Sequence, residues 1–200
     1  MLLYGAGGHA KVIISIAQRL GIEIKGIFDD APKVSSLKDI PVYPNYDPHF
    51  LPQEPVIISI GNNQIRRDIK AKVRHPFAHL THPSALVEEV LVLGEGSVVF
   101  PQAIIQIDAR LGAQVIVNTA ALIEHDCLIE DYVHVGPRST LCGGVKVGEG
   151  SLIGAASTVL PNIQIGRWTK VGAGAVVTKD IPDFAMVIGN PARIISNSSL

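Results

Sequence analysis

An aliphatic residue recurs at every sixth position from residue 87 to residue 177, without any insertion. Leu, Ile and Val make up 33 of the 93 residues from 85 to 177, so chance would fill roughly five or six of sixteen such positions. All sixteen are filled, by Val87, Leu93, Val99, Ile105, Leu111, Val117, Ile123, Ile129, Val135, Leu141, Val147, Ile153, Val159, Ile165, Val171 and Val177. This period excludes an amphipathic helix, and a sandwich of short strands would not keep one register for so long.

Two neighbouring positions in each repeat are also restricted. The residue two before the aliphatic is mostly Ala, Ser, Thr, Cys or Val, and the residue directly after it is often Gly or Asn. Gly and Asn accept a left-handed backbone turn most easily, which predicts a corner at the residue directly after the aliphatic. The corner residues are Gly94, Gly112, Asn118, Gly136, Gly148, Gly154, Gly166 and Gly172. Each repeat therefore predicts a short strand with one large and one small inward side chain, followed by a corner.

Repeats of this kind predict a three-sided prism. Three units close a triangular coil, and stacked coils bury the aliphatic ladder in the interior. Five coils fit between residues 87 and 177, although the periodicity does not reveal the handedness. Both ends of such a stack expose unpaired strand edges. We expect the N-terminal half to cover the first coil and the tail beyond Val177 to cover the last.

The N-terminal half has an α/β pattern instead. Short apolar runs alternate with amphipathic segments, which predicts a small Rossmann-like parallel βαβ sheet with helices on its faces. The expected strands are Leu2–Tyr4, Ile24–Phe28 and Val56–Ile60, and the expected helices are Lys11–Leu20 and Gln64–Val73. We therefore divide the chain into an α/β domain at 1–82 and a β-helix domain with a C-terminal cap at 83–200.

A glycine-rich loop follows the first predicted strand. Residues 5–10 read GAGGHA, which satisfies G-x-G-x-x-[GA], and Asp29 and Asp30 follow about 20 residues later. Such a loop brings phosphates to a helix N-terminus, while an acid reaches a hydroxyl or base edge. An NAD-linked enzyme would show the same features, but about 80 residues are too few for both halves of a dinucleotide fold. We expect one nucleotide here, with a purely structural turn as the alternative.

The composition narrows the class of partner. Seventeen basic and eighteen acidic residues give a net charge of -1, and no block of Lys or Arg suggests a nucleic-acid partner. No apolar run is long enough for a membrane span, and the N-terminus does not resemble a secretory signal. With only Cys127 and Cys142, a disulfide framework is not expected either. We predict a cytoplasmic protein.

The hexapeptide ladder resembles that of the left-handed β-helix acyltransferases, and residues 189–193 (GNPAR) are similar to the motif that closes many of them. Together with the N-terminal GAGGHAKV, the chain resembles the sialic-acid O-acetyltransferase (NeuD) family, which includes the PglD-like nucleotide-amino-sugar N-acetyltransferases. The resemblance implies a homotrimer that binds acetyl-CoA between neighbouring prisms. It also implies acetyl transfer to a UDP-linked or other nucleotide-linked amino sugar, with no metal and no tightly bound cofactor.

The resemblance also implies roles for individual residues. The family's base is the histidine of an E-H-D or E-H-E segment, which here is His125, with Asp126 as its orienting partner. Acetyl transfer needs a base near neutral pH, which histidine supplies. A solvated corner histidine is the alternative. Gly143 lies one coil beyond His125, where a backbone N–H would meet the thioester carbonyl. We expect His134, Ala155 and Ala173 to line the acetyl-CoA groove, with simple packing as the alternative for the alanines.

For the nucleotide sugar, the resemblance implies a site on the α/β half. Its residues are Gly7, Gly8 and His9 near the diphosphate, Asp29 and Asp30 near the base or ribose, and Gly61 and Asn62 near the sugar. Three other functions stay open. They are O-acetylation of a sialic acid or other sugar hydroxyl, a non-catalytic nucleotide-sugar-binding subunit, and a metal-dependent hydratase. The hydratase needs three histidines, whereas the ladder holds only His125 and His134.

Overall fold

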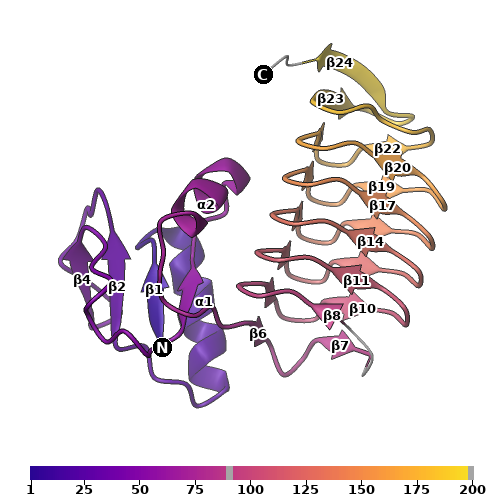
Figure 1. Cartoon of the computed structure of the whole chain (residues 1–200). Coiled ribbons are helices and arrows are strands. Elements are labelled where there is room, and N and C mark those ends of the chain that lie inside the picture. Colours follow the sequence, from indigo (N-terminus) through magenta and orange to yellow (C-terminus); the bar gives the residue numbers. More distant parts are fainter. Residues whose placement is uncertain (89–91, 198–200) are drawn as a thin grey trace.

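The computed structural model describes residues 1–88 and 92–197. An α/β domain lies beside the lower coils of a tall β-prism (Figure 1). The α/β domain has a five-stranded sheet in the order β3-β4-β2-β1-β5, in which β1, β2, β4 and β5 run parallel. Its elements are β1 (Leu2–Tyr4), α1 (Gly8–Arg19), β2 (Gly26–Asp29), β3 (Ser36–Leu37), β4 (Ile40–Pro44), β5 (Val56–Ile58) and α2 (Asn63–Lys70).

Alternate residues of the central strands point to opposite faces of this sheet. Leu3, Ile27 and Ile57 are fully buried against α1, and the residues that flank them in sequence are buried on the side of α2. The parallel sheet with helices on both faces confirms the predicted βαβ fold. Several boundaries differ by one to three residues from the predicted ones, and at the glycine-rich loop α1 begins at Gly8 rather than at Lys11.

The prism has three parallel sheets, which we name by their order along the chain. The junction face contains β6 (Leu80–Thr81), β9 (Val98–Val99), β12 (Ile116–Val117), β15 (His134–Val135), β18 (Leu152–Ile153), β21 (Lys170–Val171), β23 (Ala185–Ile188) and the antiparallel β24 (Arg193–Asn197). The second face contains β7 (Leu86–Val87), β10 (Ile104–Ile105), β13 (Leu122–Ile123), β16 (Thr140–Leu141), β19 (Thr158–Val159) and β22 (Val176–Val177). The third face contains β8 (Val92–Leu93), β11 (Arg110–Leu111), β14 (Leu128–Ile129), β17 (Lys146–Val147) and β20 (Gln164–Ile165).

The predicted ladder forms the prism core. From Val99 onward every periodic aliphatic is at most 3% exposed, while Val87 and Leu93 at the lower end are partly buried against the same core. Strands pair with those 18 residues away, as in Ile105 with Ile123. The predicted triangular coil of three repeats is therefore confirmed.

The corner geometry differs from the expectation. Between residues 96 and 174 the left-handed backbone falls on every sixth residue, three positions after the aliphatic, as at Asp126 and Ala156. The glycines directly after the aliphatic, such as Gly154, do not have a positive φ. They are required by close packing of the coils, because a Cβ on Gly154 would lie 2.5 Å from the carbonyl oxygen of Val171 in the next coil.

The two ends of the prism are treated differently. At the upper end, the hairpin of β23 and β24 extends the junction face with an antiparallel strand, as predicted for the tail. At the lower end, the α/β domain packs against the side of the prism rather than across the first coil (Figure 1). The reason is that Val98, Phe100 and Ile116 form an apolar surface for α1 on the junction face. β6 pairs with β9, so the chain enters the prism at Leu80, before the division proposed after residue 82.

Candidate functional site

The predicted nucleotide-binding segments meet at one edge of the α/β sheet. The carboxyl ends of β1, β2 and β5 lead into residues 5–9, 29–30 and 61–62 respectively. Because β2 and β5 lie on opposite sides of β1, the connections diverge here, and ligands of open α/β sheets bind at such a switch point. The structure thus brings together the seven residues that the sequence assigned to the nucleotide sugar.

The glycine-rich loop leads directly into α1. Gly5 has a φ of +107°, and the Ala6 N–H donates to Asp29 Oδ2 over 2.7 Å. No side chain caps α1 at Gly7, and a Cβ on Gly7 or Gly8 would meet nothing within 4 Å. The loop therefore presents an uncapped helix N-terminus beside open space, which suits an anion.

The two acids at this edge have different environments. Asp29 accepts from Ala6 N with one oxygen and from Ala31 N, at 3.0 Å, with the other. Asp30 Oδ1 accepts from the Tyr4 hydroxyl over 2.6 Å, and burial together with this bond raises the pKa of Tyr4. Asp29 therefore shapes the loop, whereas the second oxygen of Asp30 is the better placed of the two to reach a ligand.

This edge faces the junction face of the prism. The His9 ring packs 5.1 Å from the Phe100 ring and 6.2 Å from that of His134. His134 Nδ1 donates to the carbonyl oxygen of Gly61 over 3.2 Å. Burial lowers the pKa of both histidines to about 4, so both rings are neutral at pH 7.

His134 is held from the prism side by Asn118. Since the Gly61 carbonyl only accepts, Nδ1 of His134 carries the hydrogen, and Nε2 accepts from Asn118 Nδ2 over 3.0 Å. Asn118 Oδ1 in turn accepts from Thr119 N. The sequence reasoning gave Asn118 only a turn role. The available signal was an amide side chain at a position that glycine often occupies.

His125 and Asp126 occupy the corner between the second and third faces. Their side chains are 58% and 65% exposed, and His125 Nδ1 lies 2.7 Å from Asp126 Oδ2. The bond to Asp126 raises the pKa of His125, and the nearby negative charges of Asp126 and Glu124 add to the effect. Because Nδ1 carries the hydrogen of this bond, Nε2 keeps its lone pair.

Gly143 lies directly over this ring, as the coil length predicts. A Cβ at Gly143 would lie 2.6 Å from both Cε1 and Nε2 of His125. The Gly144 N–H donates to the carbonyl oxygen of His125. Among the described residues, none accepts a hydrogen bond from the N–H of Gly143.

The remaining predicted residues lie elsewhere on the prism. Ala155 and Ala173 are exposed at the corner between the junction and second faces, and the two stack because Gly154 packs against Ala173 N. His134 lies on the junction face, and its hydrogen bonds share no residue with those of His125. One chain thus places the proposed base, together with Gly143, at a different corner from Ala155 and Ala173.

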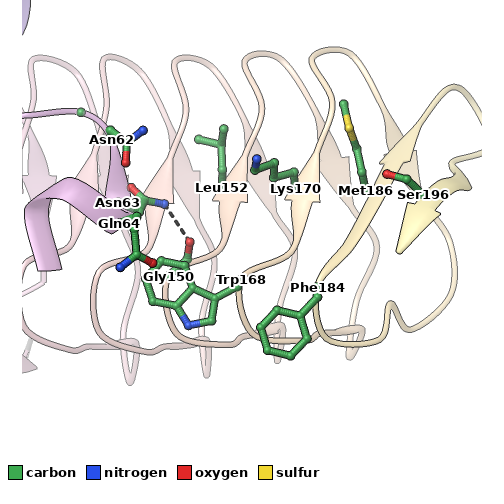
Figure 2. Close-up of a pocket in the computed structure, with 11 residues that line it drawn as sticks. Asn62, Asn63, Gln64, Gly150, Leu152, Trp168, Lys170, Phe184, Met186 and Ser196 are labelled. Carbon is green, nitrogen blue, oxygen red and sulfur yellow. Dashed lines mark hydrogen bonds between the residues drawn. The ribbon is translucent and has the colours of Figure 1, made fainter. Parts of the chain in front are cut away.

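A groove of about 340 Å³ runs along the junction face from the start of α2 (Figure 2). Leu152, Lys170 and Met186 form a row on successive strands, and Trp168 and Phe184 lie below them. Asn62 lines the groove, and its side-chain oxygen also caps α2 by accepting a hydrogen bond from Ile65 N.

Two buried polar residues of α2, Asn63 and Arg66, are not among the residues predicted from the sequence. Their spacing of three along the helix places both on the buried side with Ile69. That spacing was the only sequence signal for their burial.

Comparison with known proteins places this architecture. Residues 1–73 match the PglD N-terminal domain, and residues 126–160 and 144–179 match the bacterial transferase hexapeptide family. A mutant of perosamine N-acetyltransferase from Caulobacter crescentus, solved with CoA and GDP-perosamine, is 35% identical with a TM-score of 0.93. That match covers 98% of this chain and 96% of the other. This chain belongs to the PglD-like family of sugar N-acetyltransferases.

Other members of this family are also similar over most of their length. The acetyltransferase domain of PglB from Neisseria gonorrhoeae FA1090, solved with acetyl coenzyme A, is 37% identical with a TM-score of 0.89. That match covers 97% of this chain and 98% of the other. The fold is accordingly the left-handed parallel β-helix of that family, preceded by a Rossmann-like domain.

Two curated sequences match only in part. UDP-N-acetylbacillosamine N-acetyltransferase of Bacillus subtilis (strain 168) is 40% identical over 108 residues, which is 48% of this chain and 49% of that protein. An uncharacterized protein, L142, of Acanthamoeba polyphaga mimivirus is 37% identical over 115 residues, or 22% of its length. The chain thus matches about half of one curated relative and about a fifth of the other.

Residues 1–88 and 92–197 hold neither a cluster of metal ligands nor a membrane-spanning helix. No three His, Cys, Asp or Glu side chains in these segments lie together as metal ligands. No helix in the same segments has the length and hydropathy needed to span a bilayer.

Proposed function

We propose that this protein transfers the acetyl group of acetyl-CoA to the amine of an amino sugar attached to a nucleotide, UDP in the first instance. The observation that carries the proposal is the His125–Asp126 pair on an open prism corner, with its ring packed over Gly143. The same chemistry is supported by relatives that are similar over nearly the whole chain and were solved with CoA and GDP-perosamine or with acetyl-CoA.

His125 acts as the general base. Its Nδ1 donates to Asp126, so Nε2 keeps a lone pair and takes a proton from the sugar amine as the nitrogen attacks the thioester carbonyl. The new C–N bond gives a tetrahedral adduct, whose oxygen carries the displaced electron pair. The adduct then expels the CoA thiolate, which receives the proton from His125.

Gly143 stabilises this adduct. Its backbone packs against the His125 ring, and its N–H has no acceptor among the described residues. A backbone N–H held in place at a developing oxyanion lowers the barrier of acyl transfer. Gly143 is the residue type that fits, because a side chain would displace the base.

The nucleotide sugar binds at the carboxyl edge of the α/β sheet. Gly7 and Gly8 face its diphosphate at the uncapped end of α1, and His9 lies next to them in the first turn of the helix. Asp30 reaches the base or ribose with its unengaged oxygen, while Asp29 holds the loop. Gly61 and Asn62 contact the sugar, because they lie where this edge meets the prism.

The active site is completed by a second copy of the chain. His125 is open to water, which would compete with the amine for the thioester, and Ala155 and Ala173 lie at a different corner. We propose a homotrimer in which acetyl-CoA lies between Gly143 of one copy and Ala155 and Ala173 of its neighbour. His134, neutral at pH 7, lines the same seam.

The test is an assay of thiol release with UDP-, dTDP- and GDP-linked amino sugars, together with hydroxyl acceptors. We expect release with an amine acceptor, and about a 100-fold to 10,000-fold loss in His125→Ala with nucleotide-sugar binding intact. His49→Ala, at an exposed site in the α/β domain, is the control.

Three outcomes would contradict the proposal. Full activity in His125→Ala means that the base is another group. Activity only with hydroxyl acceptors makes the protein an O-acetyltransferase. Nucleotide-sugar binding with no thiol release for any acceptor makes it a non-catalytic binding subunit.

A further inference from the structure

Arg66 is a buried cation at the contact between the two domains. Its residue is 1% exposed, and its guanidinium donates to the carbonyl oxygens of Gln114 (2.9 Å), Ile60 (3.0 Å) and Tyr132 (2.7 Å). It also donates to Asn63 Oδ1 over 2.9 Å. Among the described residues no carboxylate pairs with Arg66, so every acceptor of this charge is a neutral carbonyl.

The acceptors that belong to the prism lie at equal spacing along it. Asn63, itself 9% exposed, donates to the carbonyl oxygens of Gly150 and Ser151 at 3.0 and 3.1 Å. Gln114, Tyr132 and Gly150 are 18 residues apart, so they occupy the same corner of three successive coils, and each has a left-handed backbone. Asn63 and Arg66 therefore bind α2 across three coils at the corner between the third and junction faces.

Arg66 also holds the loop between β5 and α2, together with His134. Arg66 holds the carbonyl of Ile60, and His134 holds the next carbonyl, that of Gly61. Asn62 is fixed by its cap of α2. The loop that meets the edge of the nucleotide site is thus tied to the prism by consecutive backbone groups.

We infer that Asn63 and Arg66 are positioning residues, which set the nucleotide-sugar domain at a fixed distance and angle from the catalytic corner. This inference rests on the proposed function. They touch neither substrate in this scheme. They act through residues 60–62, so that the sugar amine is presented to the thioester at attacking distance.

Adhesion between the domains does not explain the pair. The apolar contact of α1 with Val98, Phe100 and Ile116 already joins the domains, and burying a charge without an ionic partner is unfavourable. A planar guanidinium with several donors, however, accepts only a narrow set of orientations. Such a group sets an angle, which an apolar patch does not, and misplacement by about 1 Å can cost 100-fold in rate.

The experiment compares Arg66→Met, Arg66→Lys and Asn63→Ala with Arg74→Met, in which an exposed arginine just beyond α2 receives the same change. Steady-state kinetics give kcat and both KM values. Hydrogen exchange of residues 60–70 and the fluorescence of Trp168 report the docking of α2. Trp168 is the single tryptophan of the chain, and it packs 4.6 Å from the Arg67 guanidinium.

We expect Arg66→Met to lower kcat with the amino sugar about tenfold to 100-fold, while KM for acetyl-CoA changes less than about twofold. Exchange of residues 60–70 should accelerate at least about tenfold with the upper coils unchanged, and Arg66→Lys should restore part of kcat. Arg74→Met should match the unaltered protein in all of these measurements.

Two results would overturn the inference. One is unchanged exchange of residues 60–70 in Arg66→Met, or in Asn63→Ala if the methionine variant does not fold. The other is a proportional fall of all kinetic parameters with the folded fraction. If the unaltered protein released no thiol with any acceptor, the proposed function would fail, and the positioning role would fail with it. Faster exchange in the Arg66→Met variant would still show that Arg66 fixes α2 to the prism.

Discussion

At the scale of single residues, His125 and His134 show how location decides the chemistry of one residue type. His125 is exposed and bonded to a carboxylate, which raises its pKa, whereas burial lowers the pKa of His134 to about 4. A base that works near neutral pH needs the first environment. Burial keeps the His134 ring neutral, so that it can donate to Gly61 and accept from Asn118.

The pH dependence of the reaction should therefore follow Asp126. Protonated His125 is inactive as a base, so kcat/KM should rise with pH through a pKa above the ordinary value of 6.5. Asp126→Asn removes the main cause of the raised pKa, so the acidic limb should move to lower pH and the plateau should fall. Profiles of kcat/KM from about pH 5 to pH 9 measure both effects.

Asp108→Asn is the matched control for this profile. Asp108 occupies the same corner position one coil earlier, also with a left-handed backbone. Its replacement should leave the limb where it is. An acidic limb that stays in place in Asp126→Asn would show that another group controls the titration.

At the scale of the repeat, each corner has two special positions with different physical requirements. Where the position directly after the aliphatic is a glycine, as at Gly154, it lies against the backbone of the next coil and has no room for a Cβ. The position two residues further on has a positive φ, yet it often holds a residue other than glycine, such as Gln114 or Trp168. Space is the constraint at the first position and conformation at the second.

Two substitutions in one corner should therefore act in opposite directions. Gly154→Ala places a Cβ 2.5 Å from Val171 O and 2.6 Å from Ala173 N, and we expect it to destabilise the protein by about 1–3 kcal/mol. Ala156→Gly relieves a φ of 55°, and we expect a neutral effect or a gain of up to about 1 kcal/mol. Urea unfolding measures both, and a stable Gly154→Ala variant would contradict the packing explanation.

At the scale of the whole molecule, the contact between the domains places the nucleotide site against the prism. His9 and His134 lie inside this contact as neutral rings. Arg66 is nearby as a fixed positive charge, because burial lowers its pKa only to about 9. A proton added to either histidine would therefore be buried near an existing cation.

Acid should loosen the molecule at this contact. In the unfolded chain both histidines bind a proton near pH 6.5, whereas in the folded protein neither does so above about pH 4. The two histidines therefore make their full contribution to stability above pH 6.5. The free energy of unfolding falls as the pH drops toward 4, by up to about 3 kcal/mol for each histidine. Urea unfolding at several pH values measures the loss.

A variant separates these histidines from the other acid-sensitive groups. His134→Gln keeps hydrogen-bonding groups but cannot take up the proton, so its stability should depend less on pH between 6.5 and 4. His49→Gln, at an exposed site, should retain the original dependence. An equal pH dependence in all three proteins would place the acid sensitivity elsewhere.

The sequence alone determined the prism, because one aliphatic in every six residues can be buried only in a triangular coil. It also determined the stacking of Gly143 on His125, which follows from counting one coil length, and the glycine-rich loop at the start of α1. These features are local or strictly periodic. Their geometry follows from spacing along the chain.

The tertiary structure decided what spacing does not encode. The side-on packing of the α/β domain depends on Phe100 and its neighbours, which no periodicity marks as a docking surface. The burial of Arg66 and Asn63 depends on corner carbonyls that backbone turns direct outward, and backbone carbonyls have no signature in the sequence. The tertiary structure also decided that the left-handed residue lies three positions after the aliphatic and not directly after it. The glycines directly after the aliphatic are selected by close packing against the next coil, not by their conformational freedom.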